Sequence, residues 1–396
     1  MIIGVLAALH LVGAVILLVL SLWLFIEVVA SFLPSNATKG WDEPGPIAAV
    51  VPAHNEGKGL IPTIKDIQAQ LRPVDRLIVV ADNCDDNTAD IARAQGAEVL
   101  VRDDRSRRGK GYALQFALDH LRDAPPATVF FTDADCLHSE GLVTGVSAEA
   151  QHRQAPVQAL YVMDADDNAP PSRLVAAFAW RLINDVRMRG LMRIAGTTRL
   201  VGAGAAFPWS IAQSLTLGSG EIVEDLALTV TLAAEGQKVW YAPKHLVSST
   251  FPQDEAAAKV QRARWEHGSI GVIRQRIGRL LWSGVTNFAP WRVALALDVA
   301  VPPLTVLGAA TTLAVASGLV LGILGAWPGF VISVMAFVVL ISAVMLFWIT
   351  RGRAILPLSK APAFPAFALS KLGVYGKSGR ESSAEWTRTP RNGEKS

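Results

Sequence analysis

The chain has 396 residues, of which 51% are hydrophobic and only 18% are charged, against about 25% charged residues in an average soluble domain. The mean hydropathy of +0.33 and the presence of only two cysteines exclude an intrinsically disordered chain and a small disulfide-stabilised scaffold. The net charge of +3 is too small to indicate nucleic-acid binding. Both cysteines, Cys84 and Cys136, lie in the hydrophilic part of the chain, which favours a reducing compartment.

Residues 1–33 form an almost unbroken apolar run whose single charge is Glu27. About 20 apolar residues suffice for a transmembrane helix, whereas a signal peptide has an apolar core of ~7–15 residues that follows basic residues. No Lys or Arg precedes this run. The sequence therefore predicts an uncleaved transmembrane anchor over residues 1–33.

Strand-like and helix-like segments alternate after the anchor. The short apolar runs typical of buried strands are Pro46–Pro52, Arg76–Ala81, Ala97–Val101 and Ala127–Phe131. The segments between them with a helical pattern are Gly59–Gln70, Asn87–Gln95 and Lys110–Leu121. This alternation predicts an α/β domain with a largely parallel sheet, which we place at residues 34–273.

Carboxylates follow three of the predicted strands. Glu56 follows the first strand, Asp82 the second, and Asp133 and Asp135 the fourth. Ligands of parallel sheets bind beyond the carboxyl ends of the strands, and no glycine-rich phosphate loop is present in the sequence. Acidic side chains can hold a diphosphate only through a cation, so the pattern favours a nucleotide diphosphate bridged by Mg²⁺ or Mn²⁺. A single Asp-x-Asp pair is, by itself, more typical of a loop or a cap than of a functional site.

Two further motifs lie in the second half of the domain. Glu224 and Asp225 begin a predicted helix, where an acidic pair is also an ordinary N-terminal cap. Gln261, Arg264 and Trp265 share one helical turn, which on its own is equally typical of a solvated basic surface. The basic amphipathic stretch 178–199 is open to two interpretations, an acceptor or membrane contact and a solvated helix face.

The C-terminal third contains two more apolar runs, Val299–Gly325 and Gly329–Ile349, which predict a transmembrane hairpin over residues 293–350. Residues 274–292 are basic and amphipathic, and are either an interfacial segment or a packed helix of the domain. Residues 351–396 contain nine Lys/Arg and three Glu, so we expect an interfacial segment, with 354–375 on the membrane surface, and a basic tail. The positive charge after the last run places the C-terminus and the α/β domain in the cytosol, at the inner membrane.

Taken in order, these motifs resemble the family 2 glycosyltransferases. The resemblance is strongest to the membrane-anchored branch that includes cellulose, hyaluronan and poly-N-acetylglucosamine synthases and the ceramide glucosyltransferases. It covers about residues 47–267. The matching segments are Val50–Glu56, Ala81–Asp86, Arg108–Leu114, Thr132–Asp135, Gly202–Gly204, Glu224–Asp225 and Gln261–Trp265.

The resemblance implies a GT-A fold and a set of site roles. Glu56 and Asp82 match nucleoside contacts, and Lys110 matches a basic residue near the nucleotide. Asp133 and Asp135 match the nucleotide-side and metal-binding acids, and Asp225 matches the catalytic base. The positions implied on the diphosphate and acceptor side are Gly202, Gly204, Glu224, Gln261, Arg264 and Trp265.

The sequence thus predicts an inverting, metal-dependent glycosyltransferase that acts in exopolysaccharide or cell-envelope synthesis. Its expected partners are a nucleotide-sugar donor (a UDP-sugar), a lipid-linked or glycan acceptor, the lipid bilayer and other envelope-polysaccharide proteins. A glycolipid synthase acting on a ceramide- or diacylglycerol-like lipid is the nearest alternative. A catalytically silent subunit of an envelope complex is the second.

Overall fold

The computed structural model describes residues 1–34, 40–165, 169–218, 223–251 and 255–360. The chain forms two compact units. The sheet unit takes in Ser35–Asp164 and Gly196–Gly268, and the helical unit takes in Met1–Pro34, Ala165–Ala195 and Ser269–Arg380. The domain boundaries expected from the sequence stay predictions, and residues 361–396, with the basic tail, lie outside the described part of the chain.

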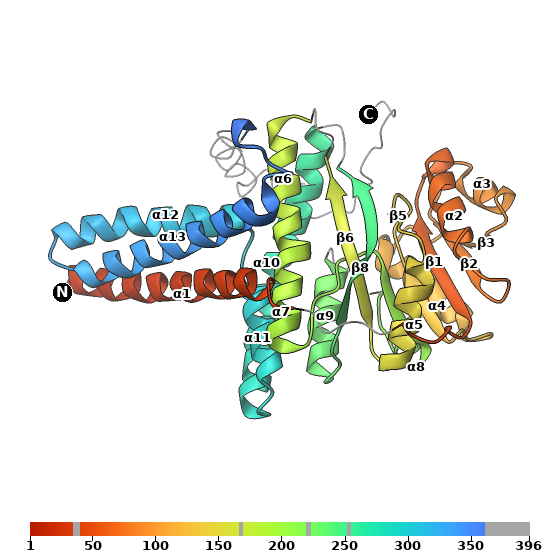
Figure 1. Ribbon diagram of the computed structural model, residues 1–396, viewed down its shortest axis with the longest axis horizontal. Helices are drawn as coiled ribbons and strands as arrows, with labels where there is room; N and C mark the ends of the chain where they lie inside the picture. Colours follow the sequence, from red (N-terminus) through yellow and green to blue (C-terminus); the bar gives the residue numbers. More distant parts are fainter. Residues whose placement is uncertain (35–39, 166–168, 219–222, 252–254, 361–396) are drawn as a thin grey trace. The chain divides into compact units, whose positions relative to one another are not determined.

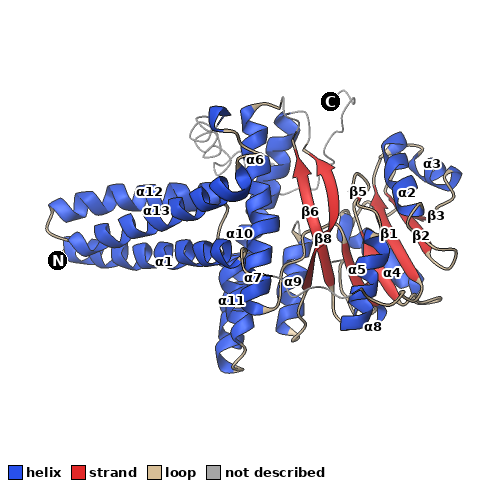
Figure 2. Cartoon of the chain, viewed as in Figure 1, coloured by secondary structure: helices blue, strands red, loops and turns tan. Residues whose placement is uncertain are grey.

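The sheet unit is built on eight strands in the order β3-β2-β1-β4-β7-β6-β8-β5. Figure 2 shows the strands in red. Strands β1 to β4 run parallel, β6 and β8 are parallel to each other, and β7 runs antiparallel between β4 and β6. The predicted α/β class with a largely parallel sheet is confirmed. The strands are β1 (Ile47–Ala53), β2 (Arg76–Asp82), β3 (Glu98–Arg102), β4 (Thr128–Phe131), β5 (Leu137–His138), β6 (Val157–Asp164), β7 (Ala205–Pro208) and β8 (Trp240–Thr250).

Helices cover this sheet and fill its core. They are α2 (Ile61–Gln68), α3 (Thr88–Ala94), α4 (Lys110–Leu121), α5 (Leu142–Arg153), α8 (Trp209–Ala212) and α9 (Glu224–Ala234), with a 3-10 turn, η1 (Gly57–Leu60). Helix α4 turns Ala113, Ala117 and Leu121 toward the same core as Val50 and Val129, because residues four apart share one face of a helix.

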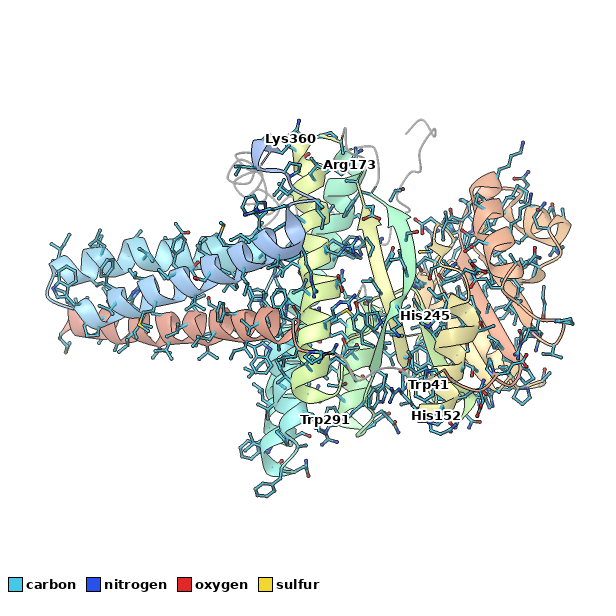
Figure 3. All side chains as sticks on the ribbon, in the orientation of Figure 1. Trp41, His152, Arg173, His245, Trp291 and Lys360 are labelled. Carbon is cyan, nitrogen blue, oxygen red and sulfur yellow. The ribbon has the colours of Figure 1, made fainter. Side chains whose placement is uncertain are left out.

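Aromatic and cation–π contacts connect the segment before β1 to α5 and β8. The rings of Trp41 and His152 lie 4.4 Å apart, and Figure 3 shows them side by side. The Arg153 guanidinium lies 3.7 Å from the ring centre of Trp240. This stacking joins the segment before β1 to α5 and β8.

The helical unit contains three helices that are long and apolar enough to cross a membrane: Ile2–Ala30, Leu304–Ile323 and Trp327–Gly352. The first two are α1 and α12, and the third joins α13 (Trp327–Phe347) to the turn η3 (Trp348–Gly352), with all three side by side in Figure 1. The run expected from Val299 is divided, because α11 ends at Ala300 and Pro302–Pro303 precede α12. The unit's other elements are α6 (Pro171–Arg181), the π-helical turn η2 (Leu182–Arg187), α7 (Met188–Ala195), the end of α10 (Glu255–Thr286), α11 (Pro290–Ala300) and η4 (Leu358–Lys360).

A polar side chain joins the three apolar helices. His10 of α1 has Nε2 3.3 Å from Ser333 Oγ of α13, and Nδ1 3.5 Å from Ser317 Oγ of α12. A Cβ atom on Gly318 or Gly329 would lie 2.8 or 2.5 Å from the His10 ring, so both positions admit the imidazole only as glycine. Small residues and interhelical hydrogen bonds of this kind stabilise helix packing in lipid.

A buried ion cluster ties α1 to the rest of the helical unit. Arg187 Nε lies 2.8 Å from Glu27 Oε2, and Arg187 Nη2 lies 2.9 Å from Asp298 Oδ1, with all three side chains almost fully buried. A Cβ on Gly190 would lie 2.0 Å from the Glu27 carbonyl oxygen, so α7 crosses α1 backbone against backbone. For Arg187, the solvated-face interpretation of the stretch 178–199 is therefore wrong.

We expect Arg187→Met to destabilise the protein by about 3–5 kcal/mol, because it leaves two buried carboxylates without their counter-charge. The measurement is the melting temperature of the full chain in detergent. Arg193→Met is the matched control, since Arg193 lies on α7, directly after η2, and within the described part of the chain its hydrogen bond goes to the Leu33 carbonyl oxygen. Equal melting temperatures for the two variants would contradict the expectation.

Candidate active site

Four acidic side chains expected from the sequence lie beyond the carboxyl ends of β1, β2 and β4. Glu56 follows β1, Asp82 ends β2, and Asp133 and Asp135 follow β4. These strands are parallel neighbours, so their ends meet at the same edge of the sheet.

Lys110 connects this edge to the second half of the sheet unit. It begins α4, and its ammonium donates hydrogen bonds to the Asp133 carboxylate and, over 2.7 Å, to the Gly202 carbonyl oxygen. Burial lowers the pKa of Lys110, but the charges of Asp133, Glu224 and Asp225 outweigh it and raise the pKa above the usual range. The side chain therefore stays a cation among three carboxylates.

The predicted glycines occupy two different environments. Gly202 has φ +84°, and a Cβ there would lie 3.7 Å from Asp225 Oδ2 and 3.8 Å from Lys110 Nζ, so this backbone passes directly beside the charged groups. Gly204 has φ +77°, and its Cβ would lie 2.4 Å from Val247 of β8. Gly204 thus allows close packing of the sheet, while Gly202 belongs to the charged site.

Both carboxyl groups of the acidic pair at the start of α9 have a raised pKa. Burial raises the pKa of Glu224 to about 7, against the opposing charge of Lys110. Burial also raises the pKa of Asp225, while the Leu226 amide, which donates to Asp225 Oδ1 over 2.9 Å, acts in the other direction. A carboxylate with a raised pKa is a stronger proton acceptor near neutral pH.

The loop after β4 offers a set of oxygen donors for a divalent ion. One ligand atom from each of Asp133, Asp135 and Cys136 lies within 4.8 Å of the others. Burial and the two neighbouring carboxylates raise the pKa of the Cys136 thiol well above its usual range. Two carboxylates beside a protonated thiol fit a hard ion such as Mg²⁺ or Mn²⁺ rather than a soft one.

The other end of the site contains an ion pair that the sequence analysis missed. Arg102, at the end of β3, lies 2.6 Å from the buried Asp82 carboxylate, and Asn83 donates to the same oxygen over 2.9 Å. Burial raises the pKa of Asp82, although Arg102 opposes this shift. The signal in the sequence was an Arg directly after the apolar run Val99–Val101. Glu56 is positioned next to this loop by its backbone amide, which donates to Thr88 Oγ1 over 2.8 Å.

Two asparagines turn the chain at the same edge. Asn55 follows β1 with φ +54°, and Asn83 follows β2 with φ +53°, a conformation that Asn tolerates better than most residues. Their side-chain oxygens accept from the amides of Asp85 and Asp104 over 2.7 and 2.8 Å. The loops that carry Glu56 and Asp82 are thereby fixed by local hydrogen bonds.

Helix α10 brings one cation to the acidic groups. The charge of Arg264 interacts with Glu224 and Asp133, and burial lowers its pKa against their attraction. Gln261 and Trp265 are half-buried on the same helix, three residues before and one residue after Arg264. The sheet unit thus assembles two cations, Lys110 and Arg264, among acids from β4 and α9, an arrangement suited to a ligand with both phosphate and hydroxyl groups.

Comparisons with known proteins agree with this geometry. A family model described as glycosyltransferase-like family 2 matches residues 44–268. An uncharacterized glycosyltransferase of Escherichia coli K12, YaiP, is 27% identical over 292 residues, which cover 68% of this chain and 69% of that protein.

Two solved structures are among the similar proteins. The mannosyltransferase PcManGT of Pyrobaculum calidifontis, in complex with GDP-Man and Mn²⁺, aligns with 88% of this chain and 99% of its own at 19% identity and a TM-score of 0.50. Glucosyl-3-phosphoglycerate synthase from Mycobacterium tuberculosis, in complex with Mn²⁺, UDP and phosphoglyceric acid, aligns with 59% of this chain and 84% of its own at 21% identity and a TM-score of 0.39. The likeness to the mannosyltransferase supports the GT-A fold.

We expect Glu224→Gln to remove a pH-dependent loss of stability. In wild type the carboxyl titrates at about 7 when folded and near 4.5 when unfolded, so ionisation favours the unfolded chain. Stability should fall as the pH rises from about 4.5 to 7, and this part of the fall should be missing in the variant. Melting temperatures across that range measure it, with the exposed Glu235→Gln at the other end of α9 as control. A wild-type-minus-variant difference that is independent of pH would contradict the expectation.

Proposed function

This chain belongs to the glycosyltransferase-like family 2, and we propose that it is a metal-dependent, inverting enzyme that transfers a sugar from a nucleotide diphosphate donor to a lipid-linked or polysaccharide acceptor. The observation that carries the proposal is the position of Lys110. Its ammonium lies between the acid Asp133, after β4, and the acidic pair at the start of α9. Around Lys110, a donor diphosphate would therefore meet a cation, and an acceptor hydroxyl would meet a carboxylate that can accept its proton.

On this proposal the nucleoside end of the donor lies against Glu56 and Asp82. Lys110 and Arg264 neutralise the diphosphate, and Asp133 and Asp135 hold the divalent ion. When bound, that ion supplies positive charge that stabilises the departing diphosphate. The charges of Arg264 and Asp133 interact, which supports their placement at one end of the donor.

We assign the proton transfer to Asp225. The acceptor oxygen forms a bond to the anomeric carbon while the bond from that carbon to the diphosphate oxygen breaks, and the electron pair leaves with the diphosphate. Asp225 accepts the hydroxyl proton, for which its raised pKa is suited. Gly202 leaves space beside Asp225 Oδ2 for the acceptor, and Glu224, Gln261 and Trp265 complete that side.

The donor is a nucleotide sugar, and we expect a UDP-sugar. The mannosyltransferase of similar fold is in complex with GDP-Man and Mn²⁺, so guanosine donors belong in the same test. The three apolar helices support an acceptor that is held at the bilayer. We place the sheet unit in the cytosol at the inner membrane, since Arg351 and Arg353 lie at the C-terminal end of the third apolar helix.

We also propose that the turn between α10 and α11 lies in the membrane interface. One face of α10 is packed, with Ile277 and Leu280 buried, whereas Trp282, Val285 and Phe288 are 71%, 62% and 93% exposed. Basic residues on the preceding turns of α10 and Trp291 on α11 (Figure 3) add the charges and the aromatic ring typical of this location.

The function is tested by nucleoside diphosphate release from the full chain in detergent. We expect release with one member of a panel of UDP- and GDP-sugars, only with added lipid extract and with Mn²⁺ or Mg²⁺, and none with a chelator. Asp225→Asn should lower turnover ~10²–10⁴-fold and retain donor binding, because it removes the proton acceptor alone. Asp90→Asn, an exposed carboxylate on α3, is the matched control.

The products separate the alternatives. A water-soluble polymer or a lipid-linked glycan supports the proposed acceptor class, whereas a single sugar on an organic-soluble membrane lipid would replace it with glycolipid synthesis. Full activity of Asp225→Asn would remove Asp225 as the base. If the protein neither binds nor cleaves any donor of the panel, the result would favour a catalytically silent subunit.

The interfacial placement is tested with spin labels at Val285→Cys and Val74→Cys, two valines that are both 62% exposed. In lipid nanodiscs and a Cys84→Ser background, we expect the label at 285 to be accessible to oxygen and protected from a water-soluble nickel chelate. The label at 74, on the loop before β2, should show the reverse. Equal accessibility to the chelate at both positions would place residue 285 in water.

A further inference from the structure

A chain of buried hydrogen bonds lies beside the acidic loop and has no role in the function proposed above. His138 Nδ1 lies 2.6 Å from Asp66 Oδ2, and His138 Nε2 lies 2.8 Å from Thr132 Oγ1. Thr132 is fully buried and His138 is 7% exposed. With Nδ1 donating to the carboxylate, Nε2 is left to accept the Thr132 hydroxyl proton.

These residues enclose the acidic loop on both sides. Thr132 immediately precedes Asp133, and His138 follows Asp135 by three positions. The two ends of the loop are thus joined through one imidazole, and that imidazole is attached to Asp66 of α2.

Helix α2 holds the same loop at two further points. The buried Thr63 donates from Oγ1 to the Ala134 carbonyl over 2.8 Å, and the backbone amide of His138 donates to Asp66 Oδ2 over 2.8 Å. Ala134 lies between Asp133 and Asp135. The middle of the loop, at Ala134, and its end, at His138, are therefore hydrogen-bonded directly to α2, and its start, at Thr132, is connected to α2 through His138.

The backbone alone gives the loop little support. Strand β5, which follows it, has only two residues, paired with Val247 and Ser248 of β8. Buried hydroxyl and imidazole groups are costly unless they are all satisfied, and a satisfied network holds one geometry. Partners behind metal ligands commonly set their orientation and change metal affinity 10–100-fold when removed.

We propose that Asp66, His138 and Thr132 are positioning residues that hold Asp133 and Asp135 in the geometry required by the divalent ion. This inference rests on the proposed function, because it takes the two acids as the metal-binding pair. The network touches neither donor nor acceptor in it and acts through the loop.

The test compares two buried threonines at opposite ends of β4. Thr132→Val and Thr128→Val each replace a fully buried hydroxyl by a methyl of the same shape. Thr132 loses its bond to His138, whereas Thr128 loses a bond of 2.6 Å from Gln151 Nε2. Both should lower the melting temperature, since each leaves one side-chain nitrogen, His138 Nε2 or Gln151 Nε2, without its partner.

The measurement is the dissociation constant of Mn²⁺ for the full chain in detergent with UDP present, followed by the electron paramagnetic resonance signal of free Mn²⁺. We expect Thr132→Val to raise the constant ~10-fold or more, Thr128→Val to leave it within ~2-fold of wild type, and Thr132→Ser to restore it. An unchanged constant in Thr132→Val, or an equal rise in both valine variants, would overturn the proposal.

Asp135→Asn separates this inference from the proposed function. If Asp135→Asn abolishes Mn²⁺ binding and Thr132→Val leaves it intact, only the positioning role fails. If wild type binds no Mn²⁺ under any of these conditions, the metal-dependent function fails and the positioning role fails with it.

Discussion

The charged site of the sheet unit depends on one partly buried cation. Lys110 stands at the start of α4, bonded to Asp133 after β4 and to the carbonyl of Gly202, within the field of Glu224 and Asp225 of α9. Three carboxylates could not be held so close together without it, since each would repel the others in a medium that screens charge poorly. In the function proposed above, the ammonium that stabilises this cluster is also the group that the donor diphosphate would share with the acids.

The parts of this site that could be predicted from the sequence are those with local signatures. Glu56, Asp82, Asp133 and Asp135 each follow a recognisable strand, and parallel strands bring such positions to one edge. The ion pair of Arg102 with Asp82 was not predicted, because it depends on β3 lying next to β2, and no local sequence pattern indicates that pairing. The contact of His138 with Asp66 was not predicted for a related reason, since Asp66 is 72 residues away in the sequence, on α2.

The helical unit shows the same limit more sharply. The stretch around Arg187 has the pattern of a basic amphipathic surface, yet that arginine is buried between charges 160 and 111 residues distant. Apolar runs identified the three long helices from hydropathy alone, because lipid requires continuous apolar length. Hydropathy does not indicate which buried charges form ion pairs. The pairing of Arg187 with Glu27 and Asp298 therefore could not be predicted from the sequence.

The ion cluster also has a consequence for how the protein is made. Its three members come from α1, from the end of η2 and from α11, so the cluster is complete only after residue 298 has left the ribosome. Glu27 on the first apolar helix has no counter-charge until Arg187 is made, and Arg187 has only one of its two carboxylate partners until Asp298 is made. Chains fold from the N-terminus as they are synthesised, which leaves this nascent intermediate exposed for the length of the intervening sequence. A chain truncated before α11 would lack Asp298 and leave the buried Nη2 of Arg187 without its acceptors, so such a chain should not reach the packing of the finished protein.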